Sequence, residues 1–154
     1  VVGDGPCYDI WKRKSEILLP GKVTWIGKLK INEITSIVSS SDCLILPSEH
    51  DGWGAVISES LIAGTPVICS NKCGAAEVVT HSGYGGVFKS GDMESLLTQL
   101  KKIINLRTNK ISQRKNLINW SKSISSKKGA EYLLNIIDYI NGVNEKPLPP
   151  WLKH

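Results

Sequence analysis

The sequence lacks the residues and motifs on which several classes of site depend. It has only three histidines, and none of them is paired at the spacing of metal ligands. The P-loop pattern GxxxxGK followed by Ser or Thr does not occur, nor does the nucleophile pattern GxSxG. Two glycine pairs begin the dinucleotide fingerprint GxGxxG but do not reach its third glycine. These absences exclude a P-loop enzyme and weigh against a dinucleotide-binding protein or a zinc enzyme.

Cysteine is scarce, and its four positions are Cys7, Cys43, Cys69 and Cys73. Cys43 and Cys69 lie in short apolar runs, where a thiol behaves as a small hydrophobic group. The spacing from Cys69 to Cys73 is CxxxC rather than the CxxC of zinc and redox sites. We therefore expect free thiols in a reducing compartment, and hence a cytoplasmic protein.

Long apolar runs are also absent. No stretch approaches the roughly 18 consecutive apolar residues of a membrane span, so we expect none. The opening stretch VVGDGPCYDIWKRK indicates a strand end and a turn rather than the apolar core of a secretion signal.

Negative charge is missing from one stretch of the chain. The net charge is +5, and between Ser95 and Ala130 there are nine lysines and arginines but no acid. One interpretation is a solvated helix face. The other is attraction to phosphate, as on an anionic lipid surface, which implies peripheral contact with the inner face of the membrane. Aromatic side chains are not interleaved with these lysines as base stacking requires, so we expect no nucleic-acid partner.

What the sequence does contain is an alternation of short apolar runs with longer amphipathic ones. The runs KVTWIG (22–27), DCLILP (42–47) and TPVICS (65–70) predict buried strands, and VVG (1–3) and GGVF (85–88) are weaker candidates. Between them the apolar spacing predicts helices at 8–19, 31–40, 55–63, 74–81 and 93–106. This alternation predicts an α/β fold, with a Rossmann-like parallel sheet and helices on both faces.

After residue 107 the strand pattern stops. Two further helices are expected in ISQRKNLINWSKSI and AEYLLNIIDYI, and residues 141–154 predict an extended, proline-rich tail. No internal boundary is evident. We therefore expect one domain over residues 1–140, a size that can bury a core.

The stretch HDGWG lies between the strand run DCLILP and a predicted helix. Ligands of open parallel sheets bind beyond the carboxyl ends of the strands. Gly52 and Gly54 have no side chain, so the backbone there can approach a ligand closely. The N-terminus of the following helix offers N–H groups and a partial positive charge, which suit a phosphate or diphosphate.

Two acids flank this loop. Glu59 is expected one turn into the helix, leaning back toward its N-terminus, where its carboxylate could accept from the vicinal hydroxyls of a ribose. Asp51 could accept from the hydroxyls of a second sugar, so the spacing suggests a nucleotide-sugar. A plainer interpretation fits as well: Asp51-Gly52 is a common turn pair, and Glu59 could face solvent between Ser58 and Ser60.

The stretch DGWGAVISESLIAGTPVICS resembles the donor-site signature of the family 4 retaining glycosyltransferases (glycosyl transferases group 1), which have the GT-B fold. That signature is an acid, seven residues and then Glu, with a Gly-aromatic-Gly loop, and here it runs from Asp51 to Glu59. Other stretches resemble further family segments in the same order: VVGDGP, VTWIG, SSSDCLILPS, CGAAEVV and GYGGVFKSGDMESL. The resemblance covers residues 1–106 closely and 107–140 loosely, and implies the C-terminal, donor-binding half of a GT-B enzyme.

The resemblance also implies roles for particular residues. Asp51 and Glu59 would be the catalytic acids, with Glu59 binding the ribose and Asp51 the transferred sugar. The segment Gly27-Lys28 would lie near the base. Five residues would meet the sugar and diphosphate through their backbone: Gly52, Trp53, Gly54, Ala55 and Val56.

The implied reaction is transfer of a sugar, with retention, from a UDP- or GDP-sugar to a glycan or lipid-linked acceptor in polysaccharide or lipopolysaccharide biosynthesis. Positive charge and N–H groups would stabilise the leaving diphosphate. No cofactor and no required metal are expected.

The sequence departs from the family pattern in two ways. Its first acid is Asp51, one methylene shorter than the usual Glu. The family also has an N-terminal acceptor domain, and a first donor-domain strand and helix with an Arg and a Lys for the diphosphate, before the point that matches Val1. We therefore expect a truncated enzyme that needs an acceptor domain as partner, with Lys28 or Lys72 as candidates for the lost charge. The alternative is a non-catalytic nucleotide-sugar binding module or subunit.

The absence of the acceptor half implies an exposed surface on the C-terminal helices. Some of their large side chains would contact that half, so we expect an apolar patch and self-association. The residues concerned are Leu117, Ile118, Trp120, Leu133, Leu134, Ile136, Ile137 and Tyr139.

Overall fold

The computed structural model describes residues 1–105 and 110–152. It forms two compact units, Val1–Ile37 and Val38–His154. The boundary between them falls inside a helix, α2 (Ile31–Ser40). In the first unit, the helix α1 (Tyr8–Leu18) buries none of its residues. The single domain expected over residues 1–140 stays a prediction.

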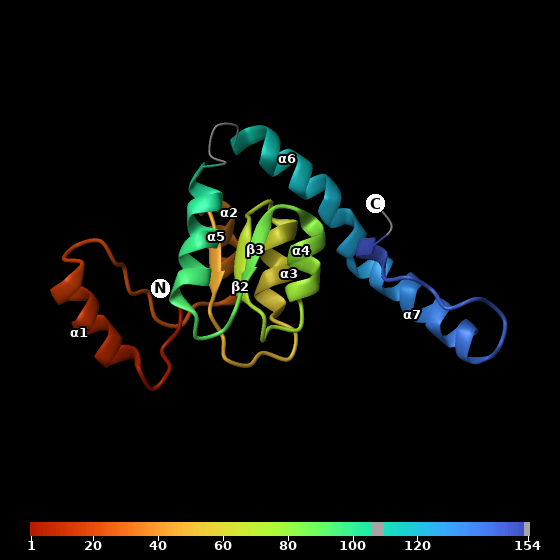
Figure 1. Ribbon diagram of the computed structural model, residues 1–154, viewed down its shortest axis with the longest axis horizontal. Helices are drawn as coiled ribbons and strands as arrows, with labels where there is room; N and C mark the ends of the chain where they lie inside the picture. Colours follow the sequence, from red (N-terminus) through yellow and green to blue (C-terminus); the bar gives the residue numbers. More distant parts are fainter. Residues whose placement is uncertain (106–109, 153–154) are drawn as a thin grey trace. The chain divides into compact units, whose positions relative to one another are not determined.

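From α2 to α5, helices and strands alternate along the chain as predicted, whereas α1 is followed directly by the helix α2 (Figure 1). None of the helices in the described residues combines the length and apolarity needed to cross a bilayer. The elements are α1 (Tyr8–Leu18), α2 (Ile31–Ser40), β1 (Leu44–Leu46), α3 (Ala55–Ile62), β2 (Val67–Ser70), α4 (Ala76–Ser82), β3 (Gly85–Phe88), α5 (Met93–Asn105), α6 (Lys110–Ser121), η2 (Lys122–Ile124), α7 (Ser126–Ile140) and η3 (Pro150–Leu152).

The first unit contains α1 and a single isolated bridge in place of two predicted strands. Val2 pairs with Gly27 in parallel, and the Gly3 N–H donates to the Gly27 carbonyl at 2.8 Å. The strands predicted at 1–3 and 22–27 are therefore wrong in extent. Both segments contain a glycine in the left-handed region, with φ of +118° at Gly3 and +76° at Gly27, and an extended strand cannot continue through such a residue.

The second unit is built on a parallel sheet in the order β1-β2-β3. All four residues of the central strand β2 are buried, as its unbroken apolar run predicted. β1 forms one edge of this sheet and leaves Ile45 42% exposed. Each strand is followed by a helix, which is the connection that parallel neighbours require.

Helices cover both faces of this sheet, as two adjacent glycines of β3 demonstrate. A Cβ on Gly85 would meet Val79 of α4 at 2.9 Å, whereas a Cβ on Gly86 would meet Gln99 of α5 at 2.3 Å. Because successive residues of a strand face opposite sides, α4 and α5 lie on opposite faces. Figure 1 shows the same arrangement, with α5 on one side and α3 and α4 on the other.

The C-terminal helices continue the second unit. Leu117 of α6 is 1% exposed and joins the core around Ile57 and Leu61. Residues 145–149 have no helix or strand, as expected for the tail. The chain then makes one turn of 3-10 helix, η3, and its Trp151 packs against the core cluster, so the tail is not extended to its end.

Candidate functional site

Two loops meet at the carboxyl ends of β1 and β2. The Asp51 N–H donates to the Lys72 carbonyl at 3.1 Å, and the Gly74 N–H donates to the Asp51 carbonyl at 3.1 Å. The Ala75 N–H donates to the Trp53 carbonyl at 2.8 Å. These three hydrogen bonds fasten the loop that precedes α3 to the loop that precedes α4. The conformation of the first loop is therefore set by the second.

The N-terminus of α3 opens from this loop. Its N-cap is Gly54, which is buried, has a φ of +80° and offers no side chain to cap the helix. The first N–H groups of a helix have no partner within the helix, and a missing cap leaves them available to a ligand. Ala55, which follows, is exposed and Val56 is half-buried. This end of α3 can therefore receive an anion.

The two acids lie on either side of this helix start. Asp51 is half-buried at the beginning of the loop, and Glu59 is exposed on α3. Ala55, Glu59 and Ile62 share the exposed stripe of α3, at the spacing of one helix face. The predicted lean of the Glu59 side chain toward the helix N-terminus stays a prediction. Neither carboxylate lines any of the three pockets described below.

Trp53 occupies the middle of the loop between its two glycines. Its indole is 45% exposed, and its Nε1 donates to Ser58 Oγ on the first turn of α3 at 3.2 Å. The ring of Trp151, from the tail, lies 6.1 Å from it between centroids. Sequence reasoning missed Trp151, because nothing in a proline-rich tail indicates where it folds back.

Comparisons with known proteins identify the family of this chain. A family model described as glycosyl transferases group 1 matches residues 1–124. The chain belongs to this family. The match confirms the family predicted from the segment Asp51 to Glu59.

The glycosyltransferases to which this chain is similar are much longer than the chain itself. The sulfoquinovosyl transferase of Arabidopsis thaliana is 28% identical over 110 residues, which are 69% of this chain and 21% of that protein. The N-acetyl-alpha-D-glucosaminyl L-malate synthase of Bacillus anthracis is 28% identical over 100 residues, 64% of this chain and 26% of that protein. The chain thus matches about a quarter or less of the length of these two relatives.

Two solved structures share the fold. WaaG, a glycosyltransferase involved in lipopolysaccharide biosynthesis, superposes with a TM-score of 0.66 at 20% identity, over 79% of this chain and 33% of that one. Sucrose-phosphate synthase from Thermosynechococcus elongatus gives 0.60 at 23% identity, over 88% and 38%. The predicted α/β fold with a parallel sheet, part of a GT-B architecture, is confirmed.

The remaining predicted donor residues, Gly27 and Lys28, lie in the first unit. Lys28 Nζ is 3.0 Å from Asp4 Oδ2, with both side chains well exposed. Exposed pairs of this kind are weak, so Lys28 remains able to bind another anion. The predicted role of this segment near the base stays a prediction.

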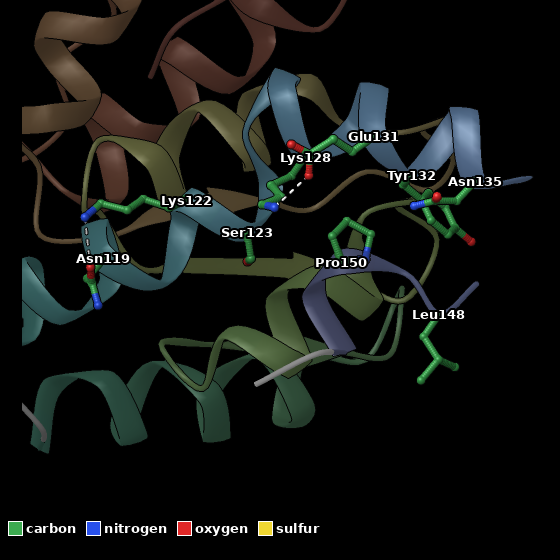
Figure 2. A pocket seen from close by; sticks show the side chains of 9 residues that line it. All are labelled: Asn119, Lys122, Ser123, Lys128, Glu131, Tyr132, Asn135, Leu148 and Pro150. Atoms are coloured by element: carbon green, nitrogen blue, oxygen red, sulfur yellow. Dashed lines mark hydrogen bonds and ion pairs between the residues drawn. The ribbon is translucent and has the colours of Figure 1, made fainter.

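One pocket of this glycosyltransferase chain lies among the C-terminal elements (Figure 2). Its volume is about 270 Å³, and α6, η2, α7 and the tail line it. Lys128 Nζ is 2.6 Å from Glu131 Oε2, and Lys122 Nζ donates to Asn119 Oδ1 at 3.0 Å. Two lysines of the basic stretch are thus engaged locally. Further pockets lie around Tyr8 and Trp25 in the first unit and beside Tyr84 in the second.

The cysteines are all free, as expected. Desolvation by burial raises the pKa of Cys43 to about 11 and that of Cys69 to about 12. Both thiols therefore stay protonated at neutral pH and behave as small hydrophobic groups. Within residues 1–105 and 110–152, no three His, Cys, Asp or Glu side chains gather as a metal site would require.

Proposed function

We propose that this chain is the donor-binding half of a glycosyltransferase that takes a sugar, with retention, from a UDP- or GDP-sugar. The observation that best supports the proposal is the hydrogen bonding between the two loops at the carboxyl ends of β1 and β2. In the joined loops, the N-terminus of α3 has no side-chain cap and lies in the sequence between the two acids of the family signature. A diphosphate matches the helix end, and carboxylates match the hydroxyls of the ribose and the transferred sugar.

The roles follow from this arrangement. The diphosphate would lie against the N–H groups of Ala55 and Val56, next to the bare backbone of Gly52. Glu59 would accept hydrogen bonds from the ribose, and Asp51 from the transferred sugar. No side chain within 4 Å would obstruct a ligand that approaches the Cβ side of Gly52.

Lys72 is the best-situated cation for the leaving diphosphate. Its carbonyl accepts the Asp51 N–H, so its backbone belongs to the same joined loops, and its side chain is exposed. A lysine here would supply the charge that stabilises a leaving diphosphate without a metal or cofactor. Replacing Lys72 by Ala should weaken binding of UDP or GDP more than binding of uridine or guanosine, which have no phosphate.

The acceptor half is proposed to come from sequence outside this chain or from a separate subunit. The two relatives named above transfer different sugars, so the proposal stops at the class of donor. The likeness to a lipopolysaccharide enzyme supports a glycan or lipid-linked acceptor in polysaccharide or lipopolysaccharide biosynthesis. Such an enzyme would act in the cytoplasm, at the inner face of the membrane.

Calorimetry with UDP, GDP, UDP-glucose and GDP-mannose tests the proposal. The wild-type chain should bind one nucleotide series, and Glu59→Ala should weaken that binding by at least about tenfold, since a charged hydrogen bond contributes roughly 1.5–3 kcal/mol. Glu94→Ala, at an exposed glutamate of α5, is the matched control and should bind like the wild type. Equal affinities for all three proteins would remove the ribose role from Glu59.

A further inference from the structure

Trp151 of the C-terminal tail contacts the loop that precedes α3. This loop, residues 51–54, is called the donor loop below. Trp151, in the single turn η3, lies with its ring centroid 6.1 Å from that of Trp53, at an interplanar angle of 54°. Trp53 is the one residue of Gly52-Trp53-Gly54 that has a side chain. The tail therefore contacts the loop at the side chain that lies between its two glycines.

The Trp151 ring also contacts residues other than Trp53. The ring of Tyr132 on α7 lies 6.4 Å from it, and the Leu152 N–H closes the turn on the Pro149 carbonyl at 3.0 Å. Trp151 also packs against the buried core cluster. Figure 2 shows the tail residues Leu148 and Pro150 across an open pocket from α6 and η2. The Trp151 ring thus lies between those of Trp53 and Tyr132, next to the core cluster.

The contact with Trp151 adds a restraint to the donor loop beyond its backbone hydrogen bonds. The backbone hydrogen bonds between this loop and the loop that precedes α4 involve Asp51 and Trp53. Glycines on both sides of Trp53 leave the backbone with more conformational freedom than other residues would. A loop that is disordered before binding loses that freedom when the ligand binds, which lowers affinity, whereas a preordered loop does not.

We propose that Trp151 is a positioning residue for the donor loop. Its ring contacts the Trp53 indole and keeps the backbone of residues 52–54 in the conformation that receives the sugar diphosphate. This inference rests on the proposed donor site. It assigns a function to the tail, which the family signature does not include.

The indole nitrogen of Trp151 suggests a control substitution. Nε1 is buried and has no hydrogen-bond partner among the described residues. Trp151→Phe keeps an aromatic ring beside Trp53 and removes the unpaired N–H together with the five-membered part of the indole. It should therefore keep the loop close to its wild-type order, whereas Trp151→Ala removes the ring contact itself.

Two measurements on the full chain test the proposal. Hydrogen exchange of the peptide covering residues 51–56 should be about three- to tenfold faster in Trp151→Ala, and unchanged in Trp151→Phe. Affinity for UDP-glucose or GDP-mannose should fall by a similar factor. Affinity for uridine or guanosine should not change, because a nucleoside does not reach the loop. If Trp151→Ala only lowered the stability of the protein, the affinities for the nucleotide-sugar and for the nucleoside would fall together.

The outcomes distinguish this inference from the proposed function. Equal exchange of residues 51–56 in the Ala and Phe variants overturns the role of Trp151. Faster exchange together with no nucleotide-sugar binding by the wild type upholds the contact with the loop but refutes the donor site. If Trp151→Ala does not fold, Tyr132→Ala removes the ring behind Trp151 and gives the same readouts. Trp11→Ala, at an exposed tryptophan of α1, controls for the loss of any indole.

Discussion

At the scale of single residues, Gly74 and Gly52 face each other across the joined loops, and only one of them tolerates a side chain. A Cβ on Gly74 would lie 2.1 Å from the Gly52 carbonyl oxygen, whereas a Cβ on Gly52 would meet nothing within 4 Å. Gly74→Ala should therefore lower the free energy of unfolding by about 1–3 kcal/mol or more. Gly52→Ala should change it by less than about 0.5 kcal/mol.

Chemical denaturation measures both changes, and calorimetry separates them from function. Gly52→Ala should still weaken nucleotide-sugar binding, because its methyl group occupies the space that a ligand needs. A Gly74→Ala protein as stable as the wild type would show that the two loops are not in contact.

The buried thiols predict a pH dependence of stability. Burial raises the pKa of Cys43 to about 11 and of Cys69 to about 12, from 9.0 for a free thiol. Above pH 9 the unfolded chain releases these protons while the folded chain retains them, so the free energy of unfolding falls as pH rises toward 11. The double variant Cys43→Ala/Cys69→Ala should start less stable but show a flatter decline. Thermal unfolding across this range tests the slope, and parallel slopes would contradict the assignment.

The candidate site could be predicted from sequence only where its residues are close together. The segment from Asp51 to Glu59 is contiguous, so its spacing and glycines were visible in the letters. Trp151 could not be predicted, because its contact with Trp53 depends on how the tail folds back. The exposure of Glu59 agrees with one of the two interpretations of the sequence, in which this residue faces solvent, but a helix pattern with serines on both sides could not decide between them.

At the scale of elements, one side chain of α6 closes the end of α2. The Arg114 guanidinium donates to the carbonyls of Ser39 and Ser41 and, at 3.2 Å, to Thr65 Oγ1. The last carbonyls of a helix have no partner within it, and a cation there also interacts favourably with the helix dipole. Arg114 is therefore a structural member of the basic stretch rather than part of a free phosphate-binding face.

Arg114→Ala should lower the free energy of unfolding by about 2–4 kcal/mol, because it removes the charged hydrogen bonds to the carbonyls of Ser39 and Ser41. Lys115→Ala, at the exposed neighbouring residue, is the matched control and should have an effect below about 0.5 kcal/mol. Urea denaturation of the two variants gives the comparison. If both variants lose the same stability, the link from α6 to α2 does not contribute.

The helices were predicted better than the strands, for a physical reason. Amphipathic spacing over ten or more residues is a strong signal, and the observed α1, α2 and α5 agree with it to within about two residues. A strand depends on partners elsewhere in the chain. KVTWIG has the composition of a strand, but glycines at positions 3 and 27 restrict it to one bridge.

At the scale of the whole molecule, α7 carries an exposed apolar surface. Leu133, Leu134 and Ile140 are 58%, 62% and 73% exposed, and Ile137 and Tyr139 are also exposed. The expected patch is thus present on α7, whereas Leu117 belongs to the buried core. Large exposed apolar patches favour association. The chain should therefore self-associate as its concentration rises.

Light scattering after size exclusion measures this association. The double variant Leu134→Glu/Ile140→Glu should remain monomeric at concentrations where the wild type associates. Lys127→Glu, a charge change at the exposed start of the same helix, serves as the control and should associate like the wild type. A wild-type chain that stays monomeric at high concentration would contradict the prediction.

The central claim is that a nucleotide-sugar binds at the start of α3. An amide-resolved NMR titration with UDP-glucose and GDP-mannose tests it most directly. The account predicts that the largest shift changes fall on residues 51–56 and on Glu59, with smaller ones at Lys72 and Gly74. Shift changes confined to the pocket between α6, α7 and the tail, or none at saturating ligand, would contradict it.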